Sequence, residues 1–203
     1  MADCDCNIEV KNKEEGKVLI ILLAINAFMF VAEITFGIIS ESTALIADSL
    51  DMLADATVYG IGLYAVGRPI LAKIRAAYVS GVFQIILGVT VATDIIRRLI
   101  LGSDPESLLM IIIGSIALVA NTICLMLISK HKEGEVHMRA SWIFSKNDVI
   151  ANLGIIIGGC LVYFLNSRLP DIIIGIFITI IVIRGGILIV KEAAKEKQLQ
   201  ADV

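Results

Sequence analysis

Three aspartates in a long apolar segment are the residues of this sequence best placed to do chemistry. Asp48, Asp51 and Asp55 follow the spacing i, i+3, i+7, so a helix would carry them on one face. A charge at membrane depth is costly and usually marks a route for ions or protons. Carboxylates that share a face also repel one another. We therefore expect a metal cation or protons to neutralise them.

A second polar pair lies about a hundred residues further along the chain. Asp148 and Asn152 are spaced i, i+4 in another apolar segment, and the run Asp148–Asn152 parallels the run Asp51–Asp55. Two such pairs on facing helices could supply four oxygen ligands between them. Oxygen ligands suit hard divalent cations.

The segments that carry these residues have the composition of a membrane protein. Of 203 residues, 58% are hydrophobic, and the mean hydropathy is +0.89, far above that of a soluble domain. A spanning helix needs roughly 20 mostly apolar residues. We therefore predict an all-α, polytopic fold with six transmembrane helices, near Val18–Ile39, Ala44–Val66, Arg75–Ile95, Leu108–Ile128, Trp142–Phe164 and Asp171–Val190.

The distribution of Lys and Arg predicts the orientation. These residues gather in the N-terminal segment, in the loops after the second and fourth apolar segments, and in the C-terminal segment. The positive-inside rule then places both termini in the cytoplasm. We predict a disordered tail over 1–16, a membrane domain over 17–191 and a short cytoplasmic tail over 192–203. A net charge of −3, with no basic patch among aromatics, argues against a nucleic-acid partner.

Two other pairs of metal-ligating residue types lie outside the predicted helices. Cys4 and Cys6 form a Cys-x-Cys pair, which could capture a metal ion or be incidental to a disordered tail. His131 and His137 lie in one polar loop, either as solvated residues or as a weak metal-capture site. A cytoplasmic position argues against a disulfide between the two cysteines.

Other polar residues inside the apolar segments have simpler interpretations. Asn26 and Glu33 are seven residues apart on one helix face, which fits either a helix–helix hydrogen bond or a place near the ion route. Asp94 precedes Arg97 and Arg98 at i+3 and i+4, a spacing that predicts an interfacial ion pair.

Taken together, these positions resemble the cation diffusion facilitators. The resemblance lies in Asn26…Glu33…Gly37…Ser42-x-Ala44-Leu45…Asp48-x-x-Asp51-x-x-x-Asp55 and, much later, Asp148-x-x-x-Asn152-x-Gly154. It implies a six-helix divalent-metal/proton antiporter rather than an enzyme. It also implies metal ligands in the pattern [His/Asp]-x-x-x-Asp on the second and fifth helices. Carried over, these ligands are Asp51, Asp55 and Asp148.

The sequence departs from the family pattern at the remaining ligand. Phe144 stands where the pattern has His or Asp. We expect Asn152 or Asp48, each one turn from a matched position, to take its place, with water as a third choice. The histidine-rich loop of some members is reduced to two histidines. The cytoplasmic C-terminal domain of most members has no counterpart here, which suggests a short, membrane-domain form.

The resemblance implies export of a divalent cation from the cytoplasm, driven by proton entry, across a bacterial inner membrane. No cofactor is expected. The transported metal is Zn²⁺ by family, whereas an all-oxygen site favours Mn²⁺, Fe²⁺ or Co²⁺. Burial and mutual repulsion favour proton uptake by the carboxylates when no metal is bound. A homodimer through the third or sixth helix is implied, and the sequence allows it at Gly81, Gly88, Gly185 and Gly186.

Two other functions fit part of the pattern. Aspartate-rich motifs on membrane helices also occur in intramembrane prenyltransferases, where carboxylates hold Mg²⁺ and a diphosphate. Such an enzyme needs two acidic clusters and basic residues for the phosphates, and this sequence has one full cluster without such a pocket. The chain could also be a non-transporting metal-binding or assembly subunit of a larger transporter.

Overall fold

The protein is a bundle of six long helices. The computed structural model describes residues 3–65, 69–130 and 136–201. In these ranges the helices are α1 (Asp3–Ile39), α2 (Thr43–Ala65), α3 (Ile70–Leu101), α4 (Ser107–Ser129), α5 (Val136–Leu165) and α6 (Leu169–Ala201), and there are no strands. The predicted all-α class with six helices is confirmed.

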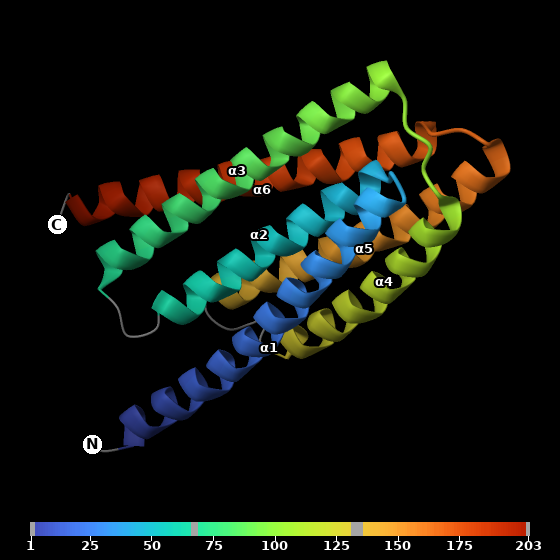
Figure 1. Ribbon diagram of the computed structural model, residues 1–203. Helices are drawn as coiled ribbons and strands as arrows, with labels where there is room; N and C mark the ends of the chain where they lie inside the picture. Colours follow the sequence, from blue (N-terminus) through green and yellow to red (C-terminus); the bar gives the residue numbers. More distant parts are fainter. Residues whose placement is uncertain (1–2, 66–68, 131–135, 202–203) are drawn as a thin grey trace.

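The α2 helix lies at the centre of the bundle. It packs against all five other helices, whereas the most extensive pairings are α3 with α6, α1 with α2 and α4 with α5. Figure 1 shows α3 and α6 side by side along one edge, with the other helices packed beneath them. The helix that carries the three aspartates is therefore the most enclosed one, which keeps their charges away from the surface.

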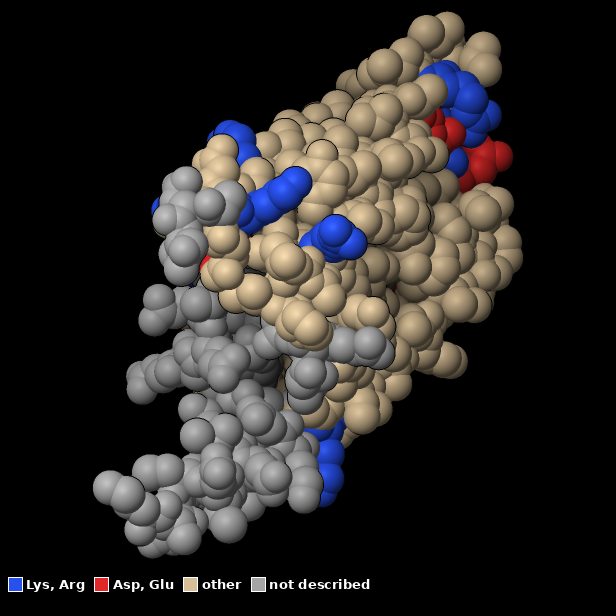
Figure 2. Space-filling view, turned by 90° about the vertical axis from the view of Figure 1, so that its left-hand side faces the viewer, with Lys and Arg blue, Asp and Glu red and all other residues tan. Residues whose placement is uncertain are grey.

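The outer surface of the bundle is apolar. Five helices of the described chain are long and apolar enough to span a membrane, and α2, with its three carboxylates, is not among them. Large side chains such as Phe28, Ile100 and Phe164 are more than two-thirds exposed. Figure 2 shows a surface made mostly of uncharged residues, with Lys and Arg in a few separate places and Asp and Glu beside them at one corner. This surface suits lipid contact and confirms a multi-pass membrane protein.

The α1 helix is longer than the sequence predicts. It begins at Asp3, so residues 3–16 continue the first membrane helix. The α6 helix likewise continues to Ala201. Lys and Glu are good helix formers, and extending an existing helix avoids the cost of nucleating a new one. The predicted division of the chain into two tails and a membrane domain stays a prediction.

The two ends of the bundle differ in character. α1 begins and α6 ends at the same end of the molecule (Figure 1). We call this the inner end, and the opposite end, where α1 turns into α2, the outer end. The positive-inside rule predicts that the inner end is cytoplasmic.

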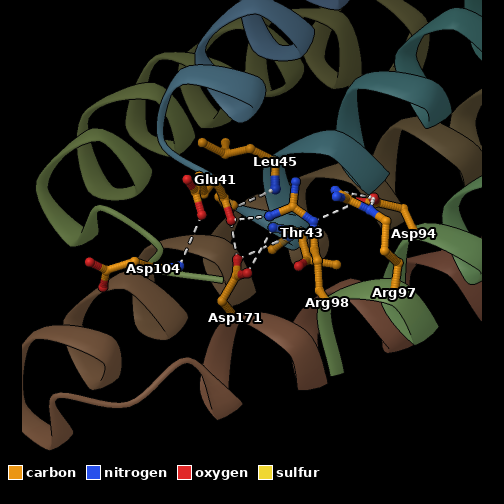
Figure 3. A network of polar contacts seen from close by, with 10 residues as sticks. Glu41, Thr43, Leu45, Asp94, Arg97, Arg98, Asp104 and Asp171 are labelled. Atoms are coloured by element: carbon orange, nitrogen blue, oxygen red, sulfur yellow. Dashed lines mark hydrogen bonds and ion pairs between the residues drawn. The ribbon is translucent and has the colours of Figure 1, made fainter. Parts of the chain in front are cut away.

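Asp171, in the first turn of α6, fixes the start of α2. Its carboxylate accepts hydrogen bonds from the Ser42 hydroxyl at 2.6 Å, from the Thr43 amide at 2.7 Å and from the Ala44 amide at 3.0 Å (Figure 3). The first amides of a helix have no partner within it. Here the Asp171 carboxylate of α6 accepts hydrogen bonds from these amides and so connects α2 to α6.

The α3 helix is tied to the same outer end through two arginines. Asp94 pairs with Arg97 at 2.8 Å and with Arg98 at 2.5 Å, which confirms the predicted ion pair. Arg98 also donates to the carbonyl of Glu41 in the α1–α2 turn. The Glu41 carboxylate in turn accepts from the Asp104 amide at 3.1 Å (Figure 3). Four helices and the α3–α4 loop therefore meet at this end.

Glycines allow α3 and α6 to approach closely. A Cβ atom at Gly81 would lie 2.9 Å from the carbonyl oxygen of Gly186, and one at Gly186 would lie 2.8 Å from that of Gly81. Gly88 likewise faces Ile183 of α6. These glycines serve contacts within the chain, so a dimer would use other surfaces of α3 or α6.

We predict that Gly186→Ala destabilises the protein by about 1–3 kcal/mol, because the new methyl group meets backbone that cannot yield easily. Gly154→Ala is the matched control, since its Cβ would meet only Ile174 side-chain atoms, the nearest at 3.6 Å. Thermal melting of the detergent-purified protein should show a lower midpoint for Gly186→Ala alone. Equal midpoints for the two variants would contradict the tight α3–α6 crossing.

Candidate metal-transport site

The three aspartates that match the family pattern come together inside the bundle. Asp51 and Asp55 on α2 and Asp148 on α5 are 8%, 4% and 6% exposed. The carboxyls of Asp55 and Asp148 lie within hydrogen-bonding reach of each other, and both are close enough to Asp51 for their charges to interact. The structure therefore brings together the predicted ligands from two helices.

These side chains are not yet arranged as a finished coordination shell. Among the described residues, no three His, Cys, Asp or Glu side chains converge closely enough to hold one ion. A divalent cation would draw the carboxylates together, because their mutual repulsion is replaced by attraction to the ion. Binding of one ion by all three aspartates would therefore require their side chains to move.

One turn toward the outer end lies a separate polar layer. Asn152 of α5 donates to a carboxylate oxygen of Asp48 at 2.5 Å. Asn121 of α4 donates to the Asn152 carbonyl at 2.8 Å. Each of these residues is at most 1% exposed. Asp48 and Asn152, the two residues expected to complete the metal site, are therefore bonded to each other within this layer.

Glu33 of α1 completes the outer layer. Its side chain is fully buried, and its carboxyl lies within hydrogen-bonding reach of that of Asp48. Neither Glu33 oxygen receives a hydrogen bond from a described donor. Two facing carboxyls away from water need a proton or a cation between them. Glu33 thus belongs beside the candidate ion route.

Asn26, the other polar residue of α1, has a structural role. Its amide donates to the Leu22 carbonyl at 2.9 Å and lies 4.0 Å from the Cys124 sulfur of α4. Both side chains are buried at 1% exposure. This is the helix–helix contact that the sequence allowed for. Asn26 thus contacts α4, whereas Glu33 faces Asp48 of α2.

On the inner side of the aspartates lies a pair of hydroxyl groups that sequence reasoning missed. The Tyr59 hydroxyl on α2 donates to an oxygen of Asp55 at 3.1 Å and lies 3.5 Å from the Ser145 hydroxyl on α5. Tyr59 and Ser145 are 1% and 0% exposed. Their spacing could have indicated that they lie beside the aspartates, because Tyr59 follows Asp55 by four residues and Ser145 precedes Asp148 by three.

Tyr59 is anchored by apolar packing. Its ring lies in a buried cluster with Leu19 and Leu22 of α1 and with Cys124 and Ile128 of α4. A ring held on all sides leaves its hydroxyl little freedom. The inner side of the candidate site is therefore bounded by an apolar layer, within which the Tyr59 hydroxyl is directed at Asp55.

Several candidate residues are outside what the structure describes. His131 lies outside the described residues. The side chains of Cys4, Cys6, His137 and Phe144 are likewise not described. The possible metal sites at Cys4 and Cys6 and at His131 and His137 stay predictions, although His137 belongs to α5 rather than to the loop before it.

Comparison with known proteins identifies the region that holds this site. The family described as "Cation efflux transmembrane domain" matches residues 19–69 and 72–196. That match includes part or all of every helix and each of the buried polar residues described above.

Three relatives illustrate the similarity. "Zinc transporter ZitB" of Pectobacterium atrosepticum is 25% identical over 194 residues, which cover 89% of this chain and 61% of the relative. "Metal cation efflux system protein CzcD" of Cupriavidus metallidurans is 26% identical over 170 residues, or 78% of this chain and 54% of the relative. "Vacuolar zinc transporter ZRC1" of Saccharomyces cerevisiae is 30% identical over 136 residues, or 59% of this chain and 30% of the relative.

The chain thus spans about three-fifths of the length of the ZitB relatives. The apolar helices, together with the bacterial relatives, support a multi-pass protein of a bacterial inner membrane.

The outer layer gives a stability prediction. Asn152→Leu keeps the size of the side chain but removes the hydrogen bonds that Asn152 makes to Asp48 and Asn121. Since each unsatisfied buried group costs roughly 1–3 kcal/mol, we expect a loss of about 2 kcal/mol or more, measured as a lower melting midpoint in detergent. Asn147→Leu, at a half-buried position of the same helix, should change the midpoint less. A smaller effect at Asn152 than at Asn147 would contradict the bonded layer.

Proposed function

Because the chain belongs to the cation efflux family, we propose that it exports a divalent transition-metal ion from the cytoplasm in exchange for protons. The observation that carries this proposal is the meeting of Asp51, Asp55 and Asp148, from two helices, at the buried centre of a membrane bundle. Three carboxylates in that position need a cationic partner. Transport supplies one at each turnover.

We assign Asp51, Asp55 and Asp148 as metal ligands. Asp48 and Asn152 are candidates for completing the shell from the outer side, as their positions one turn away suggest. All of these donors are oxygen atoms, which favours Mn²⁺, Fe²⁺ or Co²⁺ over softer ions. The names of two relatives specify zinc and that of a third specifies metal cations, so Zn²⁺ is the other candidate substrate.

Exchange follows from competition for the same oxygens. A carboxylate must be free of protons to bind a metal ion, so binding releases protons and proton return expels the ion. Metal would bind when the site opens to the inner end, and protons would enter from the outer end. The inward proton gradient then drives export. Alternating access would come from rocking α2 and α5 against their neighbours.

Two partners follow from this function. The apolar outer surface requires a lipid bilayer around the bundle. A homodimer formed through the membrane helices remains part of the proposal, with its interface on faces of α3 or α6 away from their mutual glycine contact.

The prenyltransferase alternative has little support. It needs basic residues beside the acidic cluster to hold a diphosphate. The described Lys146 and Arg184 are both exposed, and Lys146 lies over the Trp142 ring at 5.9 Å from its centre. The matched family consists of transporters. A metal-binding subunit without transport activity differs from our proposal only in its flux, which an experiment decides.

We predict that Asp51→Asn and Asp148→Asn each reduce metal-dependent proton flux in proteoliposomes by at least about tenfold, since even residues that only support ligands contribute 10–100-fold to metal affinity. Asp104→Asn, at an exposed loop position, is the control and should retain flux. Full flux in both site variants would refute the ligand assignment. Wild-type protein that binds metal without any flux would favour the assembly-subunit alternative.

A further inference from the structure

The candidate metal site has three carboxylates, and its fourth ligand is not identified by the family pattern. In the family pattern the fourth ligand stands four residues before Asp148, and Phe144 at that position has no donor atom. A divalent cation held by three side chains leaves coordination positions for further oxygens. The described residues around Asp55 and Asp148 include two buried hydroxyl groups, those of Tyr59 and Ser145.

Ser145 is placed one residue after the missing ligand. It precedes Asp148 by three residues rather than four, and both spacings put a side chain on the same helix face. Ser145 is fully buried, although the next residue of α5, Lys146, is exposed. Ser145, the residue after Phe144 on α5, therefore provides a hydroxyl that faces the bundle interior.

Contacts across the α2–α5 interface place Ser145 at the site. Its hydroxyl lies 3.5 Å from that of Tyr59, which donates to Asp55 at 3.1 Å. The Asp55 carboxyl in turn reaches that of Asp148. Ser145, Tyr59, Asp55 and Asp148 thus form one continuous polar group, to which each of the two helices contributes two members.

The chemistry of the two hydroxyls differs. A serine hydroxyl has two lone pairs and can bind a hard cation as a neutral oxygen ligand. The Tyr59 ring is fixed by Leu22, Cys124 and Ile128, so its hydroxyl acts as a stationary donor to Asp55. Donors of this kind hold a ligating carboxylate in the orientation that the metal requires.

Asp48 and Asn152, in the outer layer, are less available as metal ligands than Ser145. The Asn152 amide donates to Asp48, and its carbonyl oxygen, the atom that would bind a cation, already accepts from Asn121. Asp48 is shared between Asn152 and the facing Glu33 carboxyl. Recruiting either residue would break a buried layer that α1, α2, α4 and α5 build together.

We propose that Ser145 supplies the fourth oxygen ligand of the transported cation and that Tyr59 is the positioning residue for Asp55. This inference depends on the proposed function, because it completes the same site. It makes the inner side of the site a pair of neutral hydroxyls. A shell with three carboxylates and a hydroxyl has no nitrogen or sulfur donor, so it lacks the ligands that give Zn²⁺ its largest advantage over harder ions such as Mn²⁺.

The test substitutes the proposed ligand by a softer one. Binding of Mn²⁺ and Zn²⁺ to the detergent-purified full chain is measured by titration calorimetry, and transport of each ion in proteoliposomes gives KM and Vmax. Ser145→Ala should weaken Mn²⁺ binding about tenfold and raise KM more than it lowers Vmax. Ser145→Cys should shift the Zn²⁺-to-Mn²⁺ affinity ratio at least about tenfold toward Zn²⁺, because thiolate prefers the softer ion.

Matched controls separate ligation from packing. Ser115 of α4 is half-buried and donates to its own helix at the Ile111 carbonyl, 2.6 Å away, so Ser115→Ala and Ser115→Cys should keep the wild-type ratio. Tyr59→Phe keeps the anchored ring and removes only the hydroxyl, so it should raise KM for both ions about tenfold. Tyr78→Phe, on the exposed face of α3, should behave as wild type.

The outcomes distinguish this inference from the proposed function. A wild-type metal ratio in Ser145→Cys, with or without weaker binding in Ser145→Ala, would overturn Ser145 as a ligand. Wild-type KM in Tyr59→Phe would overturn the positioning role. In both cases transport by the wild-type protein leaves the proposed function intact. Wild-type protein that neither binds nor transports either ion would overturn the function itself.

Discussion

Carboxylates enclosed in an apolar bundle must be neutralised, and most of this architecture follows from that requirement. A helix with three aspartates gains nothing from facing lipid, and α2 accordingly packs against all five other helices. The apolar helices can then present their large side chains to the membrane. The protein thus keeps its charge at the centre by surrounding one polar helix with five apolar ones.

The buried polar residues divide into two levels with different freedom. In the outer layer, Asn121, Asn152 and Asp48 form a chain of hydrogen bonds across three helices, and such a chain favours a single arrangement. At the level of Asp51, Asp55 and Asp148, repulsion between carboxylates is only partly offset by Tyr59. This combination suits a transporter. The cation can rearrange the aspartates that bind it, while the hydrogen-bonded outer layer keeps the helices in place.

The sequence was sufficient for the features that depend on local pattern. Apolar length located all six helices, and spacing put Asp48, Asp51 and Asp55 on one helix face. The choice of Asp51, Asp55 and Asp148 as the group that meets at the centre came from the family resemblance. Features that depend on long-range contacts were not accessible in this way. Nothing near Asp171 indicates that it binds the first turn of α2, and Gly81 and Gly186 look the same whether they face another chain or each other. Tyr59 and Ser145 were missed because neutral hydroxyls are common in helices and become informative only beside a carboxylate.

The Asp171 contact holds the outer end of α2, so a tilt of the helix would pivot about that end. The helix has 23 residues, so it is about 34 Å long, and Asp51 stands about 12 Å from the fixed end. A tilt of about 10° would then carry the inner tip through about 6 Å while Asp51 moves about 2 Å. With its outer end held by Asp171, a rocking motion of α2 would therefore move the inner end of the helix about three times as far as its carboxylates.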